Sequence, residues 1–314
     1  MALIISEQVT RKLIDMPRAL AVVEKIFRDR AANKVRSLPR YRLRGNQKGL
    51  NMMAAWHADW NLFCLRFYMG GTTNAITLYS GRTGQFLALL NASYLAGLRT
   101  GATSGIAAKY LASPRARVLG VIGPGWQATF QAEAIGLSAP VQTVLVYGRN
   151  QVRRRRFIRK MQRKINADLK EAISLSEIEA QSDIIVLATD STVPILDGGL
   201  LKDEALVISI GANQVVKHEV SSDLIRRMDL IVTDDLPTAQ NDSGDLIAAH
   251  EAGILHWDDV VLLDRIVAGG KINHRPKRTL FQSNGIADDA LAVGHYVLNK
   301  VRRKRVKVRK VSEI

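Results

Sequence analysis

The residues with the clearest chemical meaning are Gly123, Gly125 and Ala128, which follow a run of aliphatic residues and precede a helix-like segment. In this Gly-x-Gly-x-x-Ala spacing, the first glycine permits a tight turn and the second lets the backbone approach a pyrophosphate, while a small third residue allows close helix–strand packing. The free N–H groups at the start of the helix, including those of Trp126 and Gln127, would donate to the phosphates. The pattern predicts a bound dinucleotide.

The end of the next apolar segment bears on which dinucleotide binds. A strand that holds the ribose 2′-hydroxyl of NAD(H) normally ends in Asp or Glu, but this segment ends at Tyr147 without a carboxylate. Arg149, with Asn150 beside it and Arg153 or Arg154 nearby, is placed to bind a 2′-phosphate through bidentate, charge-assisted hydrogen bonds. We predict that NADP(H) is preferred and that NAD(H) is possible. The alternative is that Arg149 only opens a surface loop.

The glycine turn belongs to an alternation of strands and helices that begins near residue 116. Such an alternation predicts an α/β fold with a parallel, doubly wound sheet of the Rossmann type. The predicted strands are 118–122, 143–147, 184–188, 205–210 and 230–233, and the predicted helices are 126–137, 151–166, 176–181 and 219–228.

The first third of the chain has a different pattern, in which short strands are separated by Gly and Asn. This region is predicted to be a mostly antiparallel sheet with helices, an α+β arrangement. The predicted strands are 51–55, 63–68, 75–79 and 85–90, and the predicted helices are 6–32 and 92–112, with a last amphipathic helix at 288–301.

Composition excludes several classes of protein. The chain has 314 residues, no apolar run long enough to cross a bilayer and a single cysteine, Cys64, so we expect no membrane segment and no internal disulfide. The N-terminal residues lack the basic start and cleavage site of a signal peptide, and the cytoplasm is the simplest location.

Much of the net charge of +16 lies in two basic segments, 153–164 and 300–310. Such segments can mark a surface that binds nucleic acid or another polyanion. They lack the series of interleaved aromatic residues that a base-stacking surface needs. We therefore favour a solvated helix face and a frayed basic tail over a nucleic-acid partner.

Several short motifs, spread in order over nearly the whole chain, together resemble the ornithine cyclodeaminase/mu-crystallin family. They include Arg-Thr-Gly-Ala at 99–102, Gly-Ala-Asn at 211–213, Ser-Gly-Asp-Leu at 243–246 and Phe-Gln-Ser-Asn-Gly at 281–285. The family includes cyclodeaminases, alanine dehydrogenases and ketimine reductases. The resemblance implies a homodimer with a discontinuous substrate-binding and dimerisation domain, 1–115 with 288–314, and a Rossmann dinucleotide-binding domain, 116–287.

The resemblance also implies which residues bind the substrate. Arg40 matches the family's Pro-Arg position and would bind the substrate carboxylate, for which a planar guanidinium is a good geometric match. Arg99, in the Arg-Thr-Gly-Ala motif, would help to hold the same carboxylate. The alternatives are that Arg40 is a surface residue or passes its role to Arg42, and that Arg99 only pairs with backbone carbonyls.

Four further positions are implied to contact the cofactor. Thr100 and the small residues after it would approach the phosphates, whereas Thr189, Ser283 and Gly285 would face the nicotinamide. No metal site is expected.

Two catalytic positions depart from the family. Arg66 stands where most relatives have lysine, and Asn213 stands where ornithine cyclodeaminase and the alanine dehydrogenases have aspartate. Arginine does not give up its proton in ordinary sites, and an amide cannot accept one, so a cyclisation that needs a base is disfavoured. His57 or Tyr68 could supply a proton; the alternative for His57 is a residue of a surface loop.

Together these features predict an NADP(H)-dependent oxidoreductase that transfers hydride to or from the carbon of an imine or amino acid. The substrate would be small and would bear a carboxylate, as in ketimine reductases, cyclic imino acid reductases and amino acid dehydrogenases. Two alternatives stay open: an ornithine cyclodeaminase with bound NAD(H), and a non-catalytic protein that binds cofactor and ligand.

Overall fold

The computed structural model describes residues 1–70, 72–269 and 277–311, and the chain forms two compact units. The first unit comprises Met1–Thr103 and Ile286–Ile314, and the second comprises Ser104–Gly285. Helix α3 (Ser93–Leu111) begins in the first unit and ends in the second, so the division falls inside this helix and not after residue 115, where we expected it. A continuous helix gives no sign in its sequence of the residue at which its surroundings change.

The first unit is built on a seven-stranded sheet with the order β17-β1-β6-β5-β4-β3-β2. Strands β2 to β6 pair antiparallel with their neighbours in the chain, as predicted, whereas β1 pairs parallel with β6. The sequence did not indicate β1, β2 or β17. The strands are β1 (Ala2–Ile5), β2 (Val35–Arg44), β3 (Gly49–His57), β4 (Leu62–Met69), β5 (Thr73–Ser80), β6 (Phe86–Asn91) and β17 (Arg309–Val311).

The basic tail is ordered in part, so the expectation of a frayed tail is wrong for these residues. Its residues Arg309–Val311 form β17, which pairs antiparallel with β1. This pairing gives hydrogen-bond partners to backbone groups of β1 that would otherwise lie at the edge of the sheet. The residues that precede the tail belong to helix α11 (Ala287–Arg303), which is slightly longer than predicted.

The N-terminal helical segment is two helices, α1 (Glu7–Leu13) and α2 (Met16–Ala31), where a single helix was expected. Pro17 lies in the first turn of α2, and the side chain of Asp15 caps that turn by accepting a hydrogen bond from the backbone N–H of Arg18. Proline is tolerated in a first turn but not in a helix interior, which explains the break.

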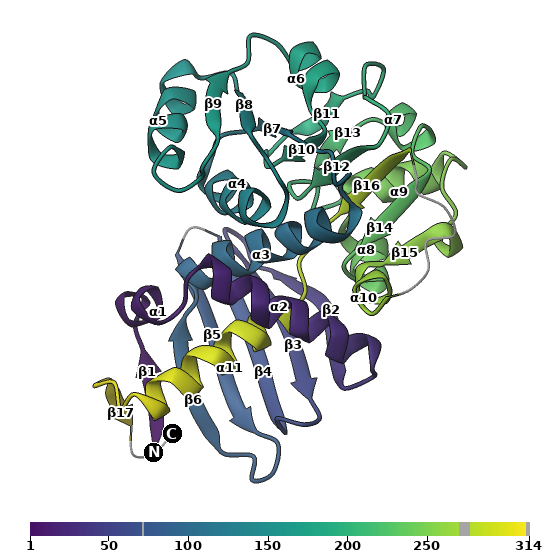
Figure 1. Cartoon of the computed structure of the whole chain (residues 1–314). Helices are drawn as coiled ribbons and strands as arrows, with labels where there is room; N and C mark the ends of the chain where they lie inside the picture. Colours follow the sequence, from purple (N-terminus) through teal and green to yellow (C-terminus); the bar gives the residue numbers. More distant parts are fainter. Residues whose placement is uncertain (71, 270–276, 312–314) are drawn as a thin grey trace. The chain divides into compact units, whose positions relative to one another are not determined.

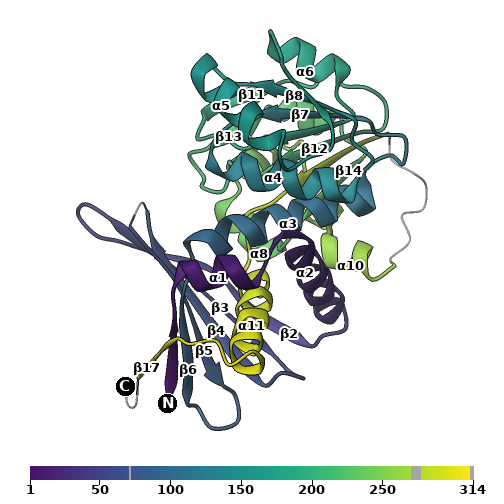
Figure 2. The same ribbon diagram turned by 60° about the vertical axis from the view of Figure 1, so that its left-hand side comes forward.

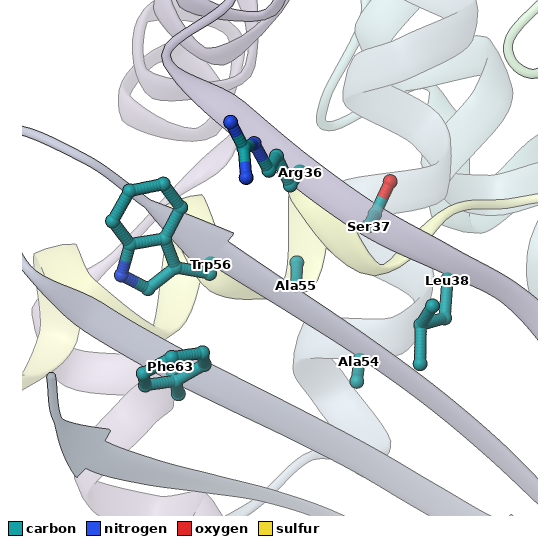
Figure 3. A pocket seen from close by; sticks show the side chains of 7 residues that line it. All are labelled: Arg36, Ser37, Leu38, Ala54, Ala55, Trp56 and Phe63. Atoms are coloured by element: carbon teal, nitrogen blue, oxygen red, sulfur yellow. The ribbon is translucent and has the colours of Figure 1, made fainter.

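The two faces of the first unit's sheet differ. Helices α2 and α11 pack together, and α11 crosses one face over β2 to β5 (Figures 1 and 2). Alternation along β4 places Cys64 and Arg66 on this covered face and Phe63 on the other. The opposite face carries exposed apolar side chains, among them Leu38, which is 57% exposed, and Phe63, which is 49% exposed. Figure 3 shows both beside a shallow pocket with Trp56 and Arg36.

The second unit is built on an eight-stranded sheet with the order β15-β14-β16-β12-β10-β7-β8-β9, and all its pairings are parallel. This arrangement confirms the predicted doubly wound α/β fold. The strands are β7 (Val118–Ile122), β8 (Thr143–Tyr147), β9 (Asp168–Glu171), β10 (Ile184–Leu187), β12 (Ala205–Ser209), β14 (Leu230–Thr233), β15 (Val260–Leu262) and β16 (Arg278–Gln282).

The remaining elements of the second unit surround this sheet (Figure 1). They are α4 (Trp126–Ser138), α5 (Gln151–Met161), α6 (Leu175–Gln181), α7 (Ser222–Arg226), α8 (Leu236–Asp242), α9 (Gly244–Glu251), the 3-10 helix η1 (Trp257–Asp259), α10 (Leu263–Val267) and the strand pair β11 (Thr192–Leu196) and β13 (His218–Val220). The helix predicted at 219–228 is therefore wrong at its start, where the chain forms β13. In the described ranges, no helix has the length and apolar character to span a membrane.

Candidate active site

The glycine turn has the geometry that its sequence predicts. Gly123 has φ +84°, and a Cβ at this position would lie 2.7 Å from the carbonyl oxygen of Ala188. The backbone N–H of Gly123 also donates to the carbonyl oxygen of Tyr147, at 3.1 Å. Only glycine satisfies both the left-handed backbone and the close approach, so the turn ties the ends of β7, β8 and β10 together.

The space beside Gly125 is open, as a bound pyrophosphate requires. A Cβ at Gly125 would have only the carbonyl oxygen of Gly123 near it, at 3.9 Å. Gly125 is the N-cap of α4, and the backbone N–H groups of Trp126 and Gln127 lie in the first turn, where no carbonyl of the helix can accept from them. The turn and the helix start therefore fit the phosphates of a dinucleotide.

The end of β8 presents two different arginines. Arg149 and Asn150 are exposed, and Asn150 caps α5 by accepting from the N–H of Arg153 at 3.0 Å. Arg154 instead donates from Nε to Glu171 at 2.8 Å, and this contact, together with Arg155, lowers the pKa of the Glu171 carboxyl. Arg149 forms no ion pair with any described residue, so it is the guanidinium that remains available to a phosphate.

A buried carboxylate that sequence reasoning missed holds the loop at Thr189. Glu219 is fully buried and accepts from the N–H of Thr189 at 2.6 Å, from its hydroxyl at 2.8 Å and from the N–H of Gly211 at 2.7 Å. The hydroxyl of Ser209 donates to the same carboxylate at 2.8 Å. Glu219 thus joins the loops that follow β10 and β12.

Asp245 lies beside Glu219 and was also not expected to act here. It accepts from the backbone N–H of Glu219 at 3.0 Å and from that of Val220 at 3.3 Å. Burial, and then the negative charge of Glu219, raises the pKa of Asp245 to about 8, and burial raises the pKa of Glu219 as well. Burial and mutual repulsion therefore both oppose ionisation of this pair of carboxyl groups.

A third buried carboxylate, Asp234, organises the loop that contains Ser283 and Gly285. It accepts from the Ser283 hydroxyl at 2.8 Å, from the Asn284 N–H at 3.2 Å and from the Gly285 N–H at 2.9 Å. Gly285 has φ +77°, which favours glycine. The sequence offered one signal, because Asp234 directly follows the strand 230–233, where ligand-facing loops begin in parallel sheets.

Asn213, one of the two predicted catalytic residues, lies in the loop after β12. Its side-chain amide donates to the carbonyl oxygen of Ile210 at 3.0 Å, and its own N–H donates to Gly211. The residue therefore shapes the loop whose other end is held by Glu219.

The first unit gathers three arginines, Arg40, Arg66 and Arg99, on the covered face of its sheet; we call them the arginine cluster. Arg66 is 4% exposed, and its Nη1 contacts the Met53 sulfur at 3.5 Å. No described carboxylate pairs with Arg66. Burial, followed by the positive charge of Arg99, lowers the pKa of Arg66 to about 9, which still leaves it charged at neutral pH.

The other two members of the cluster are also buried. Arg99 lies on α3 and donates to both carboxylate oxygens of Asp289, at 3.2 and 2.9 Å, and to the backbone carbonyl of Ile286 at 3.4 Å. Arg40 is 8% exposed and sits at an irregularity in the pairing of β2 with β3, so the surface alternative for it is wrong. Arg42 binds the Asn51 side chain instead.

Thr100, which was expected to approach the cofactor phosphates, has its hydroxyl bonded within its own helix. The hydroxyl donates to the carbonyl oxygen of Ala96 at 2.8 Å, one turn earlier in α3, and the residue is 8% exposed.

The two candidate proton donors have opposite surroundings. His57 is not in a surface loop, as the alternative had it: it is fully buried, 3.0 Å from Asp29, and its Nδ1 accepts from the N–H of Trp60. Both its ring nitrogens are therefore engaged in the fold. Tyr68 lies next to the arginine cluster, with the guanidinium carbon of Arg66 4.4 Å from its ring centroid.

A metal site in the described part of the chain would be a cluster of side chains that hold the ion. No group of three or more His, Cys, Asp or Glu side chains there is arranged to hold a metal ion.

Comparisons with known proteins give one consistent answer. A sequence model of the ornithine cyclodeaminase/mu-crystallin family matches residues 3–305. An alanine dehydrogenase of Archaeoglobus fulgidus is 29% identical over 97% of this chain and 96% of its own length. The structure of a delta(1)-pyrroline-2-carboxylate reductase of Thermococcus litoralis in complex with NADH and L-proline has a TM-score of 0.93 at 26% identity, covering 98% of this chain and 100% of that one. An archaeal alanine dehydrogenase dimer with bound NAD has a TM-score of 0.91 at 28% identity, covering 98% of this chain and 99% of that one.

Proposed function

Because the chain belongs to the ornithine cyclodeaminase/mu-crystallin family, we propose that it is an NADP(H)-dependent oxidoreductase acting on the C=N or C–N bond of a small substrate that bears a carboxylate. The observation that carries the proposal is the buried guanidinium of Arg66. It forms no ion pair with a described carboxylate. The positive charges of Arg99 and Arg40 repel it, and the charge of Asp289 offsets this repulsion only in part. Such a group is costly unless an anion joins it.

The chemistry of the cluster suits an α-imino or α-amino acid. Asp289 binds Arg99, whereas no described carboxylate forms an ion pair with Arg66, so the Arg66 guanidinium keeps its positive charge for the substrate carboxylate. When bound, the reduced nicotinamide supplies hydride to the substrate carbon. The arginines would hold the carboxylate and so fix the orientation of the neighbouring C=N bond. Such orientation accelerates a reaction most when the bound geometry is rigid.

The preference for NADP(H) rests on the end of β8. One solved relative is in complex with NADH and another has bound NAD, which supports a nicotinamide dinucleotide as the cofactor of this chain. In this chain Arg149 is exposed and without an ion pair, whereas Arg154 is held by Glu171. A free guanidinium at this position favours a 2′-phosphate over a 2′-hydroxyl.

The proposal includes a homodimer formed through the uncovered face of the first unit's sheet. That face exposes Leu38, Leu43 and Phe63, of which Leu43 is 64% exposed (Figure 3 shows the other two). A group of large apolar side chains on an open sheet marks a protein contact. One solved relative is a dimer, which agrees with a second copy as the partner.

The test is oxidation of reduced cofactor, followed by absorbance, with a panel of cyclic imino acids and of keto acids mixed with amines. We expect turnover that is faster with NADPH than with NADH. Arg149→Ala should reduce that preference roughly tenfold or more, since hydrogen bonds to charged groups contribute about 1.5–3 kcal/mol. Arg163→Ala, at an exposed basic residue beyond α5, is the matched control.

Three results would count against the proposal. Absence of turnover across the panel with cofactor bound would leave the non-catalytic alternative. Release of ammonia and proline from ornithine would support cyclodeamination. An unchanged NADPH preference in Arg149→Ala would remove the argument for the 2′-phosphate.

A further inference from the structure

We propose that Tyr68 is the catalytic residue that gives the substrate nitrogen its proton during imine reduction. The inference rests on the function proposed above and names the group that completes it. It starts from a gap in the arginine cluster: three guanidinium groups can bind a carboxylate, but arginine does not release a proton at neutral pH.

A proton donor is needed because of the charges already present. A protonated imine would be repelled by Arg40, Arg66 and Arg99, so their combined field favours binding of the neutral imine. A neutral imine that receives hydride at carbon must gain a proton at nitrogen in the same reaction. The donor must lie beside the cluster and carry no positive charge itself.

Tyr68 meets these conditions by its place on β4. It is two residues from Arg66, so both side chains lie on the same face of the strand, about 7 Å apart along it. Its ring packs against the Arg66 guanidinium, with 4.4 Å between the guanidinium carbon and the ring centroid. The Asn51 amide donates to the Tyr68 carbonyl at 3.3 Å and accepts from Arg42, which fixes this part of the strand.

The electrostatics at Tyr68 suit a phenol that must become an anion. Burial opposes ionisation, but the positive charges of Arg40 and Arg66, with those of Arg42 and Arg99, outweigh it and lower the pKa of Tyr68 below its ordinary value. The phenolate left after proton transfer is therefore stabilised where it forms. The Tyr68 side chain is half-buried, so water can return the proton afterwards.

The other candidate groups near the cluster are engaged or unsuitable. Burial raises the pKa of the Cys64 thiol, which makes it a poor acid. Asp289 accepts from Arg99 with both oxygens, and Asp288 binds Arg30. His57 is used by Asp29 and the backbone of Trp60 and lies four residues along β3 from Met53, roughly 13 Å from the strand position opposite Arg66.

The proton and electron balance is complete. The substrate carbon receives a hydride from the reduced nicotinamide, and the π-electron pair of the C=N bond moves to nitrogen. The nitrogen takes the proton of the Tyr68 O–H bond, whose electron pair stays on the phenolic oxygen. The imine is reduced by two electrons, the nicotinamide is oxidised, and the phenolate regains its proton from water.

The experiment compares Tyr68→Phe with Tyr79→Phe, a matched loss of a hydroxyl on the neighbouring strand β5. We expect kcat for imine reduction to fall by about 10²–10⁴-fold in Tyr68→Phe, the usual contribution of a positioned acid, and to be unchanged in Tyr79→Phe. Affinity for an amino acid product, measured by calorimetry, should change little in both. The alkaline fall in the wild-type rate, where Tyr68 ionises, should be lost in Tyr68→Phe.

A second readout does not depend on turnover. Ultraviolet absorbance of tyrosinate, followed as pH rises in the protein without substrate, should show one tyrosine ionising before the others. That early step should be absent in Tyr68→Phe and present in Tyr79→Phe.

The outcomes separate the two proposals. If the wild type reduces no imine, the proposed function fails and Tyr68 loses its role with it. If the wild type is active and Tyr68→Phe is equally fast, or if the early ionisation persists in Tyr68→Phe, the role of Tyr68 alone is refuted.

Discussion

The buried carboxylates of the second unit and the buried Arg66 of the first are treated in opposite ways. In the second unit, the carboxylates of Glu219 and Asp234 each accept several hydrogen bonds from backbone N–H groups and hydroxyls of neighbouring loops. In the first unit, the buried guanidinium of Arg66 has a methionine sulfur and an aromatic ring as its nearest partners. The first arrangement is satisfied within the fold, whereas the second leaves a buried positive charge that the proposed substrate carboxylate would neutralise.

The difference separates charges that build a site from charges that bind its ligand. A buried ion with a full set of hydrogen bonds fixes the backbone around it, as Asp234 does at Gly285. A buried ion without a counter-charge costs stability and is retained where a ligand needs it. Removal of each kind of charge should therefore affect different quantities.

The largest effect is expected from Arg66→Met, which should lower kcat/KM for a carboxylate substrate by about 30-fold or more, since loss of a buried charged partner costs about 2–5 kcal/mol. The free energy of unfolding in urea should stay equal or rise, because an uncompensated buried charge is removed. Arg82→Met, in an exposed turn, is the control. If Arg66→Met were strongly destabilised but kept a normal kcat/KM, Arg66 would support the fold and would not bind the substrate.

A somewhat smaller effect is expected from Asp234→Ala, this time on stability. Three donors, at Ser283, Asn284 and Gly285, would lose their acceptor, and unmade buried hydrogen bonds cost about 1–3 kcal/mol each, reduced here by rearrangement or entry of water. We expect a loss of about 2–4 kcal/mol in urea unfolding. Asp168→Ala, in an exposed ion pair with Lys170, should lose less than about 1 kcal/mol. Equal losses in the two variants would contradict the structural role of Asp234.

The last effect is a pH dependence at Asp245, which is the smallest of the three when it is counted per pH unit. The folded protein keeps the Asp245 proton up to a pKa of about 8, whereas the unfolded chain releases it near 3.8, so the folded state binds more protons between these values. The free energy of unfolding should therefore fall as pH rises through this window, by at most about 1.4 kcal/mol per pH unit. In Asp245→Asn the free energy of unfolding should depend less on pH than in the wild type, when both are measured by urea unfolding across this range. If the wild type instead became more stable relative to Asp245→Asn as pH rises, Asp245 would be ionised in the folded protein.

The family, the enzyme class and the α/β fold could be predicted from the sequence, and the comparisons confirm them. Strands such as Val118–Ile122 are buried in a parallel sheet and read as continuous apolar runs. Strand β16 was missed although it lies between β12 and β14, because Arg278 and Gln282 give its short sequence polar ends. The break before α2 depended on the local effect of Pro17, which a long apolar stripe concealed.

For the site, the sequence could indicate the buried arginines of the first unit but not the groups that support the loops of the second. Arg40, Arg66 and Arg99 could be selected because they stand at motif positions that the family resemblance marks. Glu219 and Asp234 act through backbone N–H groups contributed by distant segments, which carry no residue-specific signal. Glu219 was even assigned to a helix, since a three-residue strand such as β13 has too few residues to show alternation.

The unmet charge of Arg66 makes the heat stability of the protein a means of identifying its substrate. Any carboxylate that occupies the cluster in the folded state alone raises the melting temperature, and a ligand at 100 times its dissociation constant adds about 2.7 kcal/mol of stability. A thermal melt in the presence of each member of an acid library would thus rank candidate metabolites without requiring that a single molecule be turned over.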